Sequence, residues 1–389
     1  MKELDLQKFL REHPDNWKEI LKKSPFELII NEYPDGRVIF KYVQFASDFT
    51  KELVRESRGI ILQKGTWDVV CLPFSKFFNF GEPNAFDLCL TGSSIIEKTD
   101  GSIIKVYFYD GKWRVATNGT IEAEDASTRD DKITFKDLFF DVISPDRFEE
   151  LTSFYFHRDD TYLFELIHPM NRVVVDYHGK KELIFIGCRN NKSFVDDDIF
   201  ILQYPFVKKF EEIRLPRVFM MHIYYLSELS KIADDLNLNG ADFEGFVVVE
   251  TGDFEVKGRI KIKSPKYLKL HRLTGGEGVS NNIINILLDG EQDEFEAYMN
   301  QLPSYIKDEY EETKAKYEKL LVELESCFSH FKKMSEEVSR KELAFSIIKE
   351  KPNLKGLIFT HIDHGKNPVD LLRNQLNSTK KVKYLLEKI

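Results

Sequence analysis

IIEKTDGSIIKVYFYDGKW, residues 95–113, places a single lysine, Lys98, between two apolar runs. A Thr-Asp-Gly-Ser turn follows Lys98, and the second run ends at Asp110-Gly111, a dipeptide typical of tight hairpins. In that turn, Gly101 permits a close backbone approach or a positive φ. A lysine nucleophile must lose its proton, and burial or nearby positive charge lowers its pKa. The stretch therefore predicts paired strands and makes Lys98 a candidate nucleophile, with a surface lysine in a hairpin as the alternative.

Short β-rich runs broken by turns continue on both sides of this stretch, from about residue 37 to about residue 265. RVVVDY, residues 172–177, is one of the runs, and HGKK at 178–181 is typical of another hairpin. Helical patterns interrupt the β region near 133–151 and 222–238. The mixture of antiparallel strands and helices predicts an α+β fold.

The two ends of the chain have a helical character instead. Residues 1–30 form a helical pattern, and the segment after the β region is helical throughout. In that segment apolar residues recur at three-, four- and seven-residue steps between Tyr310 and Phe331, which indicates an amphipathic helix. We therefore expect two domains, residues 1–272 and an all-helical domain of residues 273–389.

Composition is that of an ordinary soluble globular protein, with 42% hydrophobic and 31% charged residues among 389. The net charge of −9 argues against indiscriminate coating of nucleic acid, although residues 301–389 carry 17 Lys and Arg against 14 Asp and Glu. The polar N-terminus does not resemble a signal peptide, and the scattered cysteines are expected to be reduced thiols. These features predict a cytoplasmic protein.

Charged residues stand within or beside other runs of the β region. Each one alone is typical of an outward-facing strand residue. They are Arg58 in SRGIIL, Lys76 in KFFNFGEP, Glu165 in FELIHPMNRVVVDY, Glu244 before Gly245, and Lys261 and Lys263 in KIKSPKYLKLH. The last two are separated by one residue, so their side chains point to one face of a strand.

From Lys98 onward, the order of these residues resembles that of the covalent nucleotidyltransferases, which include ATP-dependent ligases and mRNA capping enzymes. Their pattern is KxDG, an acidic strand, EG with apolar residues, and KxK. The finer stretches quoted above are similar to those of the phage-type RNA ligase 1 family, the tRNA-repair ligases, over about residues 35–272. The resemblance implies an ATP-grasp-like ligase domain of antiparallel sheets, with the nucleotide in the cleft between them, followed by a helical C-terminal domain.

The resemblance also implies an ATP-dependent RNA ligase reaction in three steps. Lys98 would attack the α-phosphate of ATP, releasing pyrophosphate and leaving lysyl-AMP. AMP would then pass to the 5′-phosphate of an RNA end. A 3′-hydroxyl would finally attack the activated phosphate and displace AMP. Such chemistry depends mainly on positioning and charge neutralisation.

Roles for the individual residues follow from the same resemblance. The catalytic set is Lys98, Lys261 and Lys263, the last two at the α-phosphate, where negative charge accumulates. The ATP-binding set comprises Arg58 and Lys76 at the phosphates, Glu165 at the ribose hydroxyls, and Thr99, Gly101 and Asn118. Glu244 and Asp100 are expected to hold a hydrated Mg²⁺ or Mn²⁺. This ion and the basic cluster are expected to favour the neutral amine of Lys98.

One position departs from the family pattern. After the hairpin the family usually carries a basic residue before glycine, whereas VATNGT places Asn118 before Gly119. A neutral amide can hydrogen-bond a phosphate but cannot neutralise it. Either a neighbour compensates, with Arg114 and Lys112 as the candidates, or one reaction step is weakened.

Three alternatives remain open at the level of the sequence. A DNA ligase and a GTP-using capping enzyme share the motif order, but no OB-fold pattern follows the β region. An RNA-binding damage sensor that kept the ligase fold and lost turnover is the third, and Asn118 is the feature that favours it. The expected partner is RNA with 5′-phosphate and 3′-hydroxyl ends, including cleaved tRNA, while the oligomeric state is not indicated.

Overall fold

The computed structural model describes residues 3–44, 46–128, 132–197, 204–238, 243–268, 279–289, 304–373 and 378–388. The chain divides into two compact units, unit 1 from Met1 to Tyr267 and unit 2 from Leu268 to Ile389. The expected domain boundary after residue 272 lies outside the described residues. Among those residues, none of the helices has the length and apolar character needed to cross a membrane.

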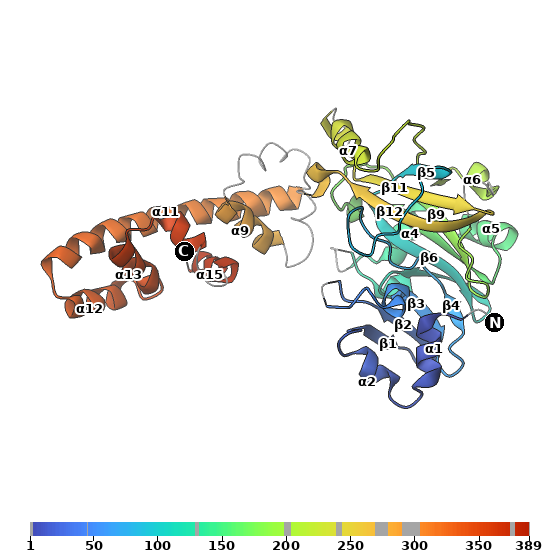
Figure 1. Ribbon diagram of the computed structural model, residues 1–389, viewed down its shortest axis with the longest axis horizontal. Helices are drawn as coiled ribbons and strands as arrows, with labels where there is room; N and C mark the ends of the chain where they lie inside the picture. Colours follow the sequence, from blue (N-terminus) through green and yellow to red (C-terminus); the bar gives the residue numbers. More distant parts are fainter. Residues whose placement is uncertain are drawn as a thin grey trace. The chain divides into compact units, whose positions relative to one another are not determined.

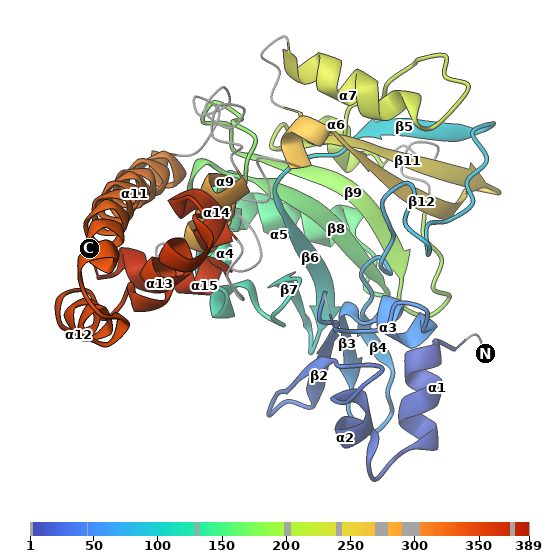
Figure 2. The same ribbon diagram turned by 60° about the vertical axis from the view of Figure 1, so that its left-hand side comes forward.

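A five-stranded sheet in the order β10-β9-β8-β6-β7 runs through the middle of unit 1 (Figure 2). Its strands are β6 (Ser102–Tyr109), β7 (Lys112–Thr117), β8 (Asp160–Ile167), β9 (Glu182–Asn190) and β10 (Ile213–Arg214). All pairs are antiparallel except β9 with β10. Asp110 and Gly111 join β6 to β7 with φ values of 49° and 74°, which confirms the predicted hairpin.

One face of this sheet is covered by the helices α4 (Phe135–Val142), α5 (Pro145–Tyr155) and α6 (Phe206–Lys209). Ile104 and Val106 of β6 point into that core. Side chains alternate along a strand, so Ile103, Lys105 and Tyr107 point to the opposite face. That opposite face of β6 packs against the other sheets of unit 1.

The three-stranded antiparallel sheet has the order β12-β11-β5. It is built from β5 (Ser93–Glu97), β11 (Gly245–Gly252) and β12 (Glu255–Lys263), with α7 (Glu228–Leu238) on its outer face (Figure 1). Phe246 and Val248 pack under α7, whereas Ile96 and Val247 point away from it. The inner face therefore presents Lys261, Lys263 and the end of β5 toward the five-stranded sheet.

The N-terminal part of unit 1 carries a four-stranded sheet, β1 (Ile29–Glu32), β2 (Arg37–Lys41), β3 (Arg58–Gln63) and β4 (Val69–Cys71). The helices α1 (Asp5–Glu12), α2 (Trp17–Leu21) and α3 (Glu52–Glu56) accompany it. Val38, Phe40 and Ile60 pack with α1 and α2 on one face. On the other face Ile39 and Ile61 pack with Tyr107, which joins this sheet to β6.

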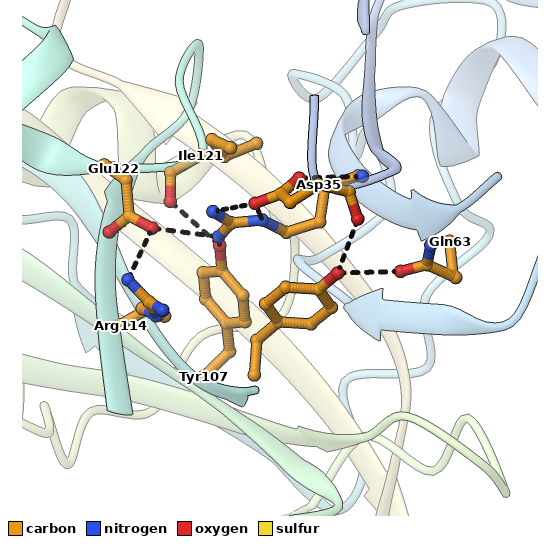
Figure 3. A network of polar contacts seen from close by, with 8 residues as sticks. Asp35, Gln63, Tyr107, Arg114, Ile121 and Glu122 are labelled. Atoms are coloured by element: carbon orange, nitrogen blue, oxygen red, sulfur yellow. Dashed lines mark hydrogen bonds and ion pairs between the residues drawn. The ribbon is translucent and has the colours of Figure 1, made fainter. Parts of the chain in front are cut away.

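A polar cluster strengthens the same junction (Figure 3). Arg37, 4% exposed, donates to the hydroxyl of Tyr107 over 2.6 Å and is paired with Asp35 at 2.7 Å and Glu122 at 2.9 Å. The Tyr107 hydroxyl in turn donates to the carbonyl of Ile121. The cluster thus fixes the segment after β7 against the N-terminal sheet.

All described segments of unit 2 are helical, and no β-strand lies among them. The helices are α9 (Val279–Asp289), α11 (Ser304–Glu337), α12 (Arg340–Glu350), α13 (Lys355–His364), α14 (Pro368–Arg373) and α15 (Ser378–Leu386). The predicted apolar stripe lies on α11, where Tyr310, Tyr317 and Phe328 are at most 3% exposed. Because α11 contacts α9, α13 and α15, the stripe belongs to the core of unit 2.

The expected strand at 172–177 is wrong. A short 3-10 helix, Pro169–Asn171, ends just before this run, and Val174 and Val175 lie in a non-strand segment that leads to the turn at His178-Gly179. Their backbone N–H groups each donate to Asp100 over 2.8 Å. The apolar pattern led us to expect that these N–H groups bond to a neighbouring strand. They bond instead to the side chain of Asp100, which is distant in the sequence.

Candidate active site

A cavity of about 190 Å³ is lined by side chains from both the three-stranded and the five-stranded sheet. Six of the expected site residues line it: Arg58, Lys98, Thr99, Glu165, Lys261 and Lys263. Apolar walls come from Ile96 and Val247 on one sheet and Ile103 and Ile186 on the other. The structure thus brings together residues that are up to 205 positions apart in the sequence, counting from Arg58 to Lys263.

Lys98 directly follows β5, and its side chain is paired with Glu244. The distance from Lys98 Nζ to Glu244 Oε2 is 2.8 Å, and Lys263 Nζ lies 2.9 Å from Oε1 of the same carboxylate. Glu244 is 2% exposed. Burial alone would raise the pKa of this carboxyl, but the two ammonium groups outweigh it and lower the pKa. Glu244 is therefore a buried carboxylate anion between two lysines.

The protonation of Lys98 differs from the expectation. Burial lowers the pKa of its amine, but the charges of Glu244, Glu165 and Asp100 together outweigh burial and raise it. In this state Lys98 is a protonated ammonium group. The expected neutral amine would require a change at Glu244, such as an ion or ligand that draws the carboxylate away.

Glu165 faces the same cavity from β8. Its Oε1 accepts the backbone N–H of Gly101 over 3.0 Å. Burial raises the pKa of Glu165 to about 7, against a lowering influence from Lys98. A methyl group on Gly101 would lie 2.5 Å from the carbonyl oxygen of Leu166, so only glycine allows this approach. The turn after Lys98 is thereby fixed to the strand that carries Glu165.

Among the described residues, Lys261 has aromatic and cationic neighbours and no carboxylate paired with it. Its Nζ lies 4.5 Å from the centre of the Phe77 ring, and the guanidinium carbon of Arg58 lies 5.4 Å from the same ring. Burial and the positive charges of Arg58 and Lys98 lower the pKa of Lys261 well below its usual value. An anionic ligand between these groups would relieve their repulsion.

Lys76 lines a neighbouring hollow of about 680 Å³ and not the smaller cavity. Its amine lies 4.5 Å from the Phe49 ring, 5.1 Å from Tyr42 and 5.2 Å from Phe78. Burial lowers its pKa. Phe74, Phe77 and Arg259 line both spaces, so Lys76 stands next to the cavity that holds the other expected site residues.

Asp100 is bound to the protein through both of its oxygens. Oδ2 accepts the N–H groups of Val174 and Val175, and Oδ1 accepts the hydroxyl of Tyr267 over 2.7 Å. It lines a separate cavity of about 230 Å³ that Lys98 does not line. These contacts give Asp100 a structural role, and they do not favour the prediction that it contacts a metal.

Asn118 does not line the cavity. It lies against Gly59 instead, and its Oδ1 is buried with no hydrogen-bond partner among the described residues. Neither candidate for compensation reaches the cavity. Arg114 pairs with Glu122 at 3.3 Å, within the cluster of Figure 3, and Lys112 is exposed at the start of β7. If a positive charge compensates for the neutral Asn118, it must therefore come from another residue.

The site has features that fit a nucleotide better than a metal held by protein alone. The hydroxyl of Thr99 is buried in the wall without a partner among the described residues, which leaves a donor for a ligand. Within the same part of the chain, no group of three or more His, Cys, Asp or Glu residues could hold a metal. A Mg²⁺-like ion would thus have Glu244 as its protein carboxylate, with phosphates and water completing its shell.

Two charged residues of the cavity wall were not among those expected. Arg259 precedes Lys261 and Lys263 at the same two-residue spacing on β12, so the sequence did contain a signal for it. Glu97, 3% exposed, is paired with Arg217 at 2.9 Å. Nothing local distinguishes Glu97 from a surface residue, because its partner is 120 positions away.

Taken together, the cavity places the amine of Lys98 and several cations around one space, and the buried carboxylate of Glu244 lies 2.8 Å from that amine. Such a set can neutralise phosphate charge next to a nucleophile. The fold around it is an α+β arrangement of mainly antiparallel sheets, and the cavity walls come from the three-stranded and five-stranded sheets, with Arg58 from β3.

Comparison with known families agrees with this chemistry. A family model described as RNA ligase matches residues 56–267, which includes every expected site residue. The chain belongs to this RNA ligase family.

Individual relatives extend the match. A protein of Autographa californica nuclear polyhedrosis virus, named as a bifunctional polynucleotide kinase/RNA ligase, is 30% identical over 72% of this chain and 40% of its own length. The RNA ligase of Rhodothermus phage RM378 is 27% identical over 78% of each chain. The chain thus spans less than half of the viral protein.

Among solved structures, two further ligases match with TM-scores below 0.5. An archaeal ATP-dependent RNA ligase has a TM-score of 0.44 and 14% identity, over 74% of this chain and 68% of that one. An RNA ligase of Naegleria gruberi, solved with ATP and Mn, has a TM-score of 0.36 and 16% identity over 46% and 51%.

Proposed function

We propose that this protein is an ATP-dependent RNA ligase that joins 5′-phosphate and 3′-hydroxyl ends through lysyl-AMP and RNA-adenylate intermediates. The observation that supports this most is the position of Lys98, 2.8 Å from a buried carboxylate and in one cavity with Arg58, Lys261 and Lys263. Membership of the RNA ligase family supports the same reaction.

In the first step, the Nζ of Lys98 would form a bond to the α-phosphorus of ATP, and the bond from that phosphorus to the pyrophosphate oxygen would break. The amine must first release a proton, because only its neutral form has a free electron pair. Lys261 and Lys263 would neutralise charge on the α-phosphate, and Arg58 and Lys76 would bind the departing pyrophosphate. Glu165 and Thr99 would bind the nucleoside part.

In the next two steps, AMP would move from Lys98 to an RNA 5′-phosphate, and an RNA 3′-hydroxyl would then displace it. A divalent ion, Mg²⁺ or Mn²⁺, would supply electrostatic activation of the phosphates, with Glu244 as its protein ligand. Release of Glu244 from Lys98 to such an ion would also lower the pKa of the nucleophile, since Glu244 is the largest influence that raises it.

The biological setting is proposed from the family resemblance and from the cysteines. RNA repair, with cleaved tRNA as a substrate, is the expectation from the tRNA-repair ligases. All four cysteines are free, which fits a reducing cytoplasm. Unit 2, whose residues 301–389 carry 17 Lys and Arg against 14 Asp and Glu, is proposed to select or orient the RNA.

An end-joining assay tests the function. RNA with a labelled 5′-phosphate is incubated with the protein, a divalent ion and either ATP or GTP, and the product is treated with phosphatase. We expect ATP to give joined RNA whose label resists the phosphatase, and we expect GTP or a DNA strand to give little. Binding of RNA without any joined or adenylated product would instead identify a damage sensor.

A further inference from the structure

Lys105 is a fully buried lysine, 0% exposed, that the proposed reaction does not use. It lies on β6, two residues after Ile103, and Ile103 lines the nucleotide cavity. The two side chains are therefore on the same face of the strand, with Lys105 one step farther along. Burying an amine is costly unless the surroundings bind it, so a specific role is expected.

The partner of Lys105 is a backbone carbonyl of the N-terminal sheet. Its Nζ donates to the oxygen of Gly59 over 2.5 Å, a contact between positions 46 apart in the sequence. Gly59 directly follows Arg58, which lines the nucleotide cavity. A side chain that holds the carbonyl of Gly59 also limits where the backbone of Arg58 can lie.

Asn118 lies against the same glycine. Gly59 has a φ of +83°, and a methyl group added to it would lie 2.3 Å from the backbone oxygen of Asn118 and 2.8 Å from its side-chain oxygen. Gly59 thus contacts the buried amine of Lys105 and also the position at which the resemblance leads us to expect a basic residue. A second ammonium group at position 118 would stand close to that of Lys105 and be repelled by it.

We propose that Lys105 is a positioning residue, which holds the Gly59 carbonyl and with it Arg58 at the nucleotide cavity, and thereby replaces the basic side chain that is absent at position 118. The inference rests on the proposed nucleotide chemistry. Burial lowers the pKa of Lys105 to about 8, against a raising influence from Cys71 and together with a lowering one from Lys41. The amine is thus largely a cation at neutral pH, which strengthens its bond to the carbonyl.

Substitutions at the two positions test the proposal, with the rate of covalent AMP labelling measured at several ATP concentrations. Lys105→Met removes the amine and keeps an unbranched side chain. We expect it to raise the ATP concentration for half-maximal rate about tenfold, because a hydrogen bond from a charged group is lost and only part of its effect acts on Arg58. Lys105→Gln can keep a bond to Gly59, so its loss should be smaller.

The decisive variant combines Lys105→Met with Asn118→Lys. If one basic group is needed beside Gly59, the double variant should recover at least half of the lost ATP affinity, whereas Asn118→Lys alone should bring no gain. Independent effects at the two positions, or full ATP affinity in Lys105→Met, would overturn the proposal. Lys112→Met is the matched control, because this exposed lysine is one of the two candidates that the sequence suggested, and it should behave like the unmodified protein.

Two further measurements keep the test decisive. Thermal unfolding identifies a variant that loses its fold, and if Lys105→Met does so, Lys105→Gln with and without Asn118→Lys replaces it in the comparison. If the unmodified protein shows no AMP labelling, the proposed function fails. Equilibrium binding of ATP to the same variants then decides the role of Lys105 by itself.

Discussion

At the scale of single residues, Glu244 determines the charge of Lys98. It is the largest influence that raises the pKa of the amine, ahead of Glu165 and Asp100. Lys98 is therefore protonated in the absence of substrates. Attack on phosphorus requires the Lys98–Glu244 ion pair to open, so that the amine can lose its proton. This arrangement links activation of the nucleophile to whatever ligand takes the carboxylate.

Glu244→Gln should therefore lower the pKa of Lys98 and at the same time reduce adenylylation. We expect the pKa of Lys98 to decrease, and so a faster reaction of Lys98 with an amine-reactive reagent at pH 8. Peptide mapping of the modified lysine gives the rate. Labelling by ATP should fall, since the amide binds a divalent ion poorly.

Glu165→Gln serves as the control for this comparison, because Glu165 contributes less to raising the pKa of Lys98. Its effect on the reagent rate should be the smaller of the two. Equal reagent rates in Glu244→Gln and the unmodified protein would show that the ion pair does not determine the pKa of the Lys98 amine.

At the scale of elements, a buried carboxyl attaches α1 to α3. Glu56, 7% exposed at the end of α3, accepts the backbone N–H of Leu6 over 2.8 Å and that of Asp5 over 3.2 Å. Burial raises its pKa from 4.5 to about 7 despite these bonds. Between these two pH values the folded protein retains a proton that the unfolded chain has released.

The stability contributed by this position should therefore fall as pH rises from about 4.5 to about 7, because the unfolded state binds fewer protons in that window. The full cost above pH 7 is about 3 kcal/mol. Glu56→Gln removes the titration, so relative to the unmodified protein it should gain stability between pH 5 and pH 8. Denaturant unfolding at both pH values measures this, and an equal difference at both would contradict the assignment.

Much of the β architecture could be predicted because it depends on local patterns. Alternating apolar residues and Asp110-Gly111 specify β6, β7 and their hairpin, and the two-residue spacing places Lys261 and Lys263 on one face. The error at 172–177 arose because Asp100 binds that backbone from a distance of over 70 positions.

The burial of Lys105 had no local signal either, because it depends on a segment distant in the sequence. Within SIIKVYFY a lysine is typical of an exposed strand position, and only the N-terminal sheet makes it interior. The protonation of Lys98 likewise depends on Glu244, which is 146 positions away. The sequence therefore revealed the identity of most site residues, while their charges and contacts required the fold.

At the scale of the whole molecule, all expected site residues belong to unit 1, and the apolar stripe of α11 is buried within unit 2. We expect a truncation after residue 272 to retain lysyl-AMP formation, because no nucleotide-binding residue is removed. It should lose its preference for a nicked, tRNA-like RNA over a plain single strand.

Competition between the two RNA substrates, at low and moderate salt, measures this preference. If unit 2 contacts phosphates, the difference between full-length and truncated protein should shrink as salt increases. A folded truncation with unchanged preference would refute the role proposed for unit 2.

The central claim is that Lys98 carries AMP during the reaction. The most direct measurement is incubation with ATP and a divalent ion, followed by denaturation, proteolysis and mass spectrometry to locate the adenylated residue. We predict one AMP on Lys98, absent from Lys98→Arg, while that variant still seals RNA that already bears a 5′-adenylate. AMP on a different residue, or undiminished labelling of Lys98→Arg, would contradict the account.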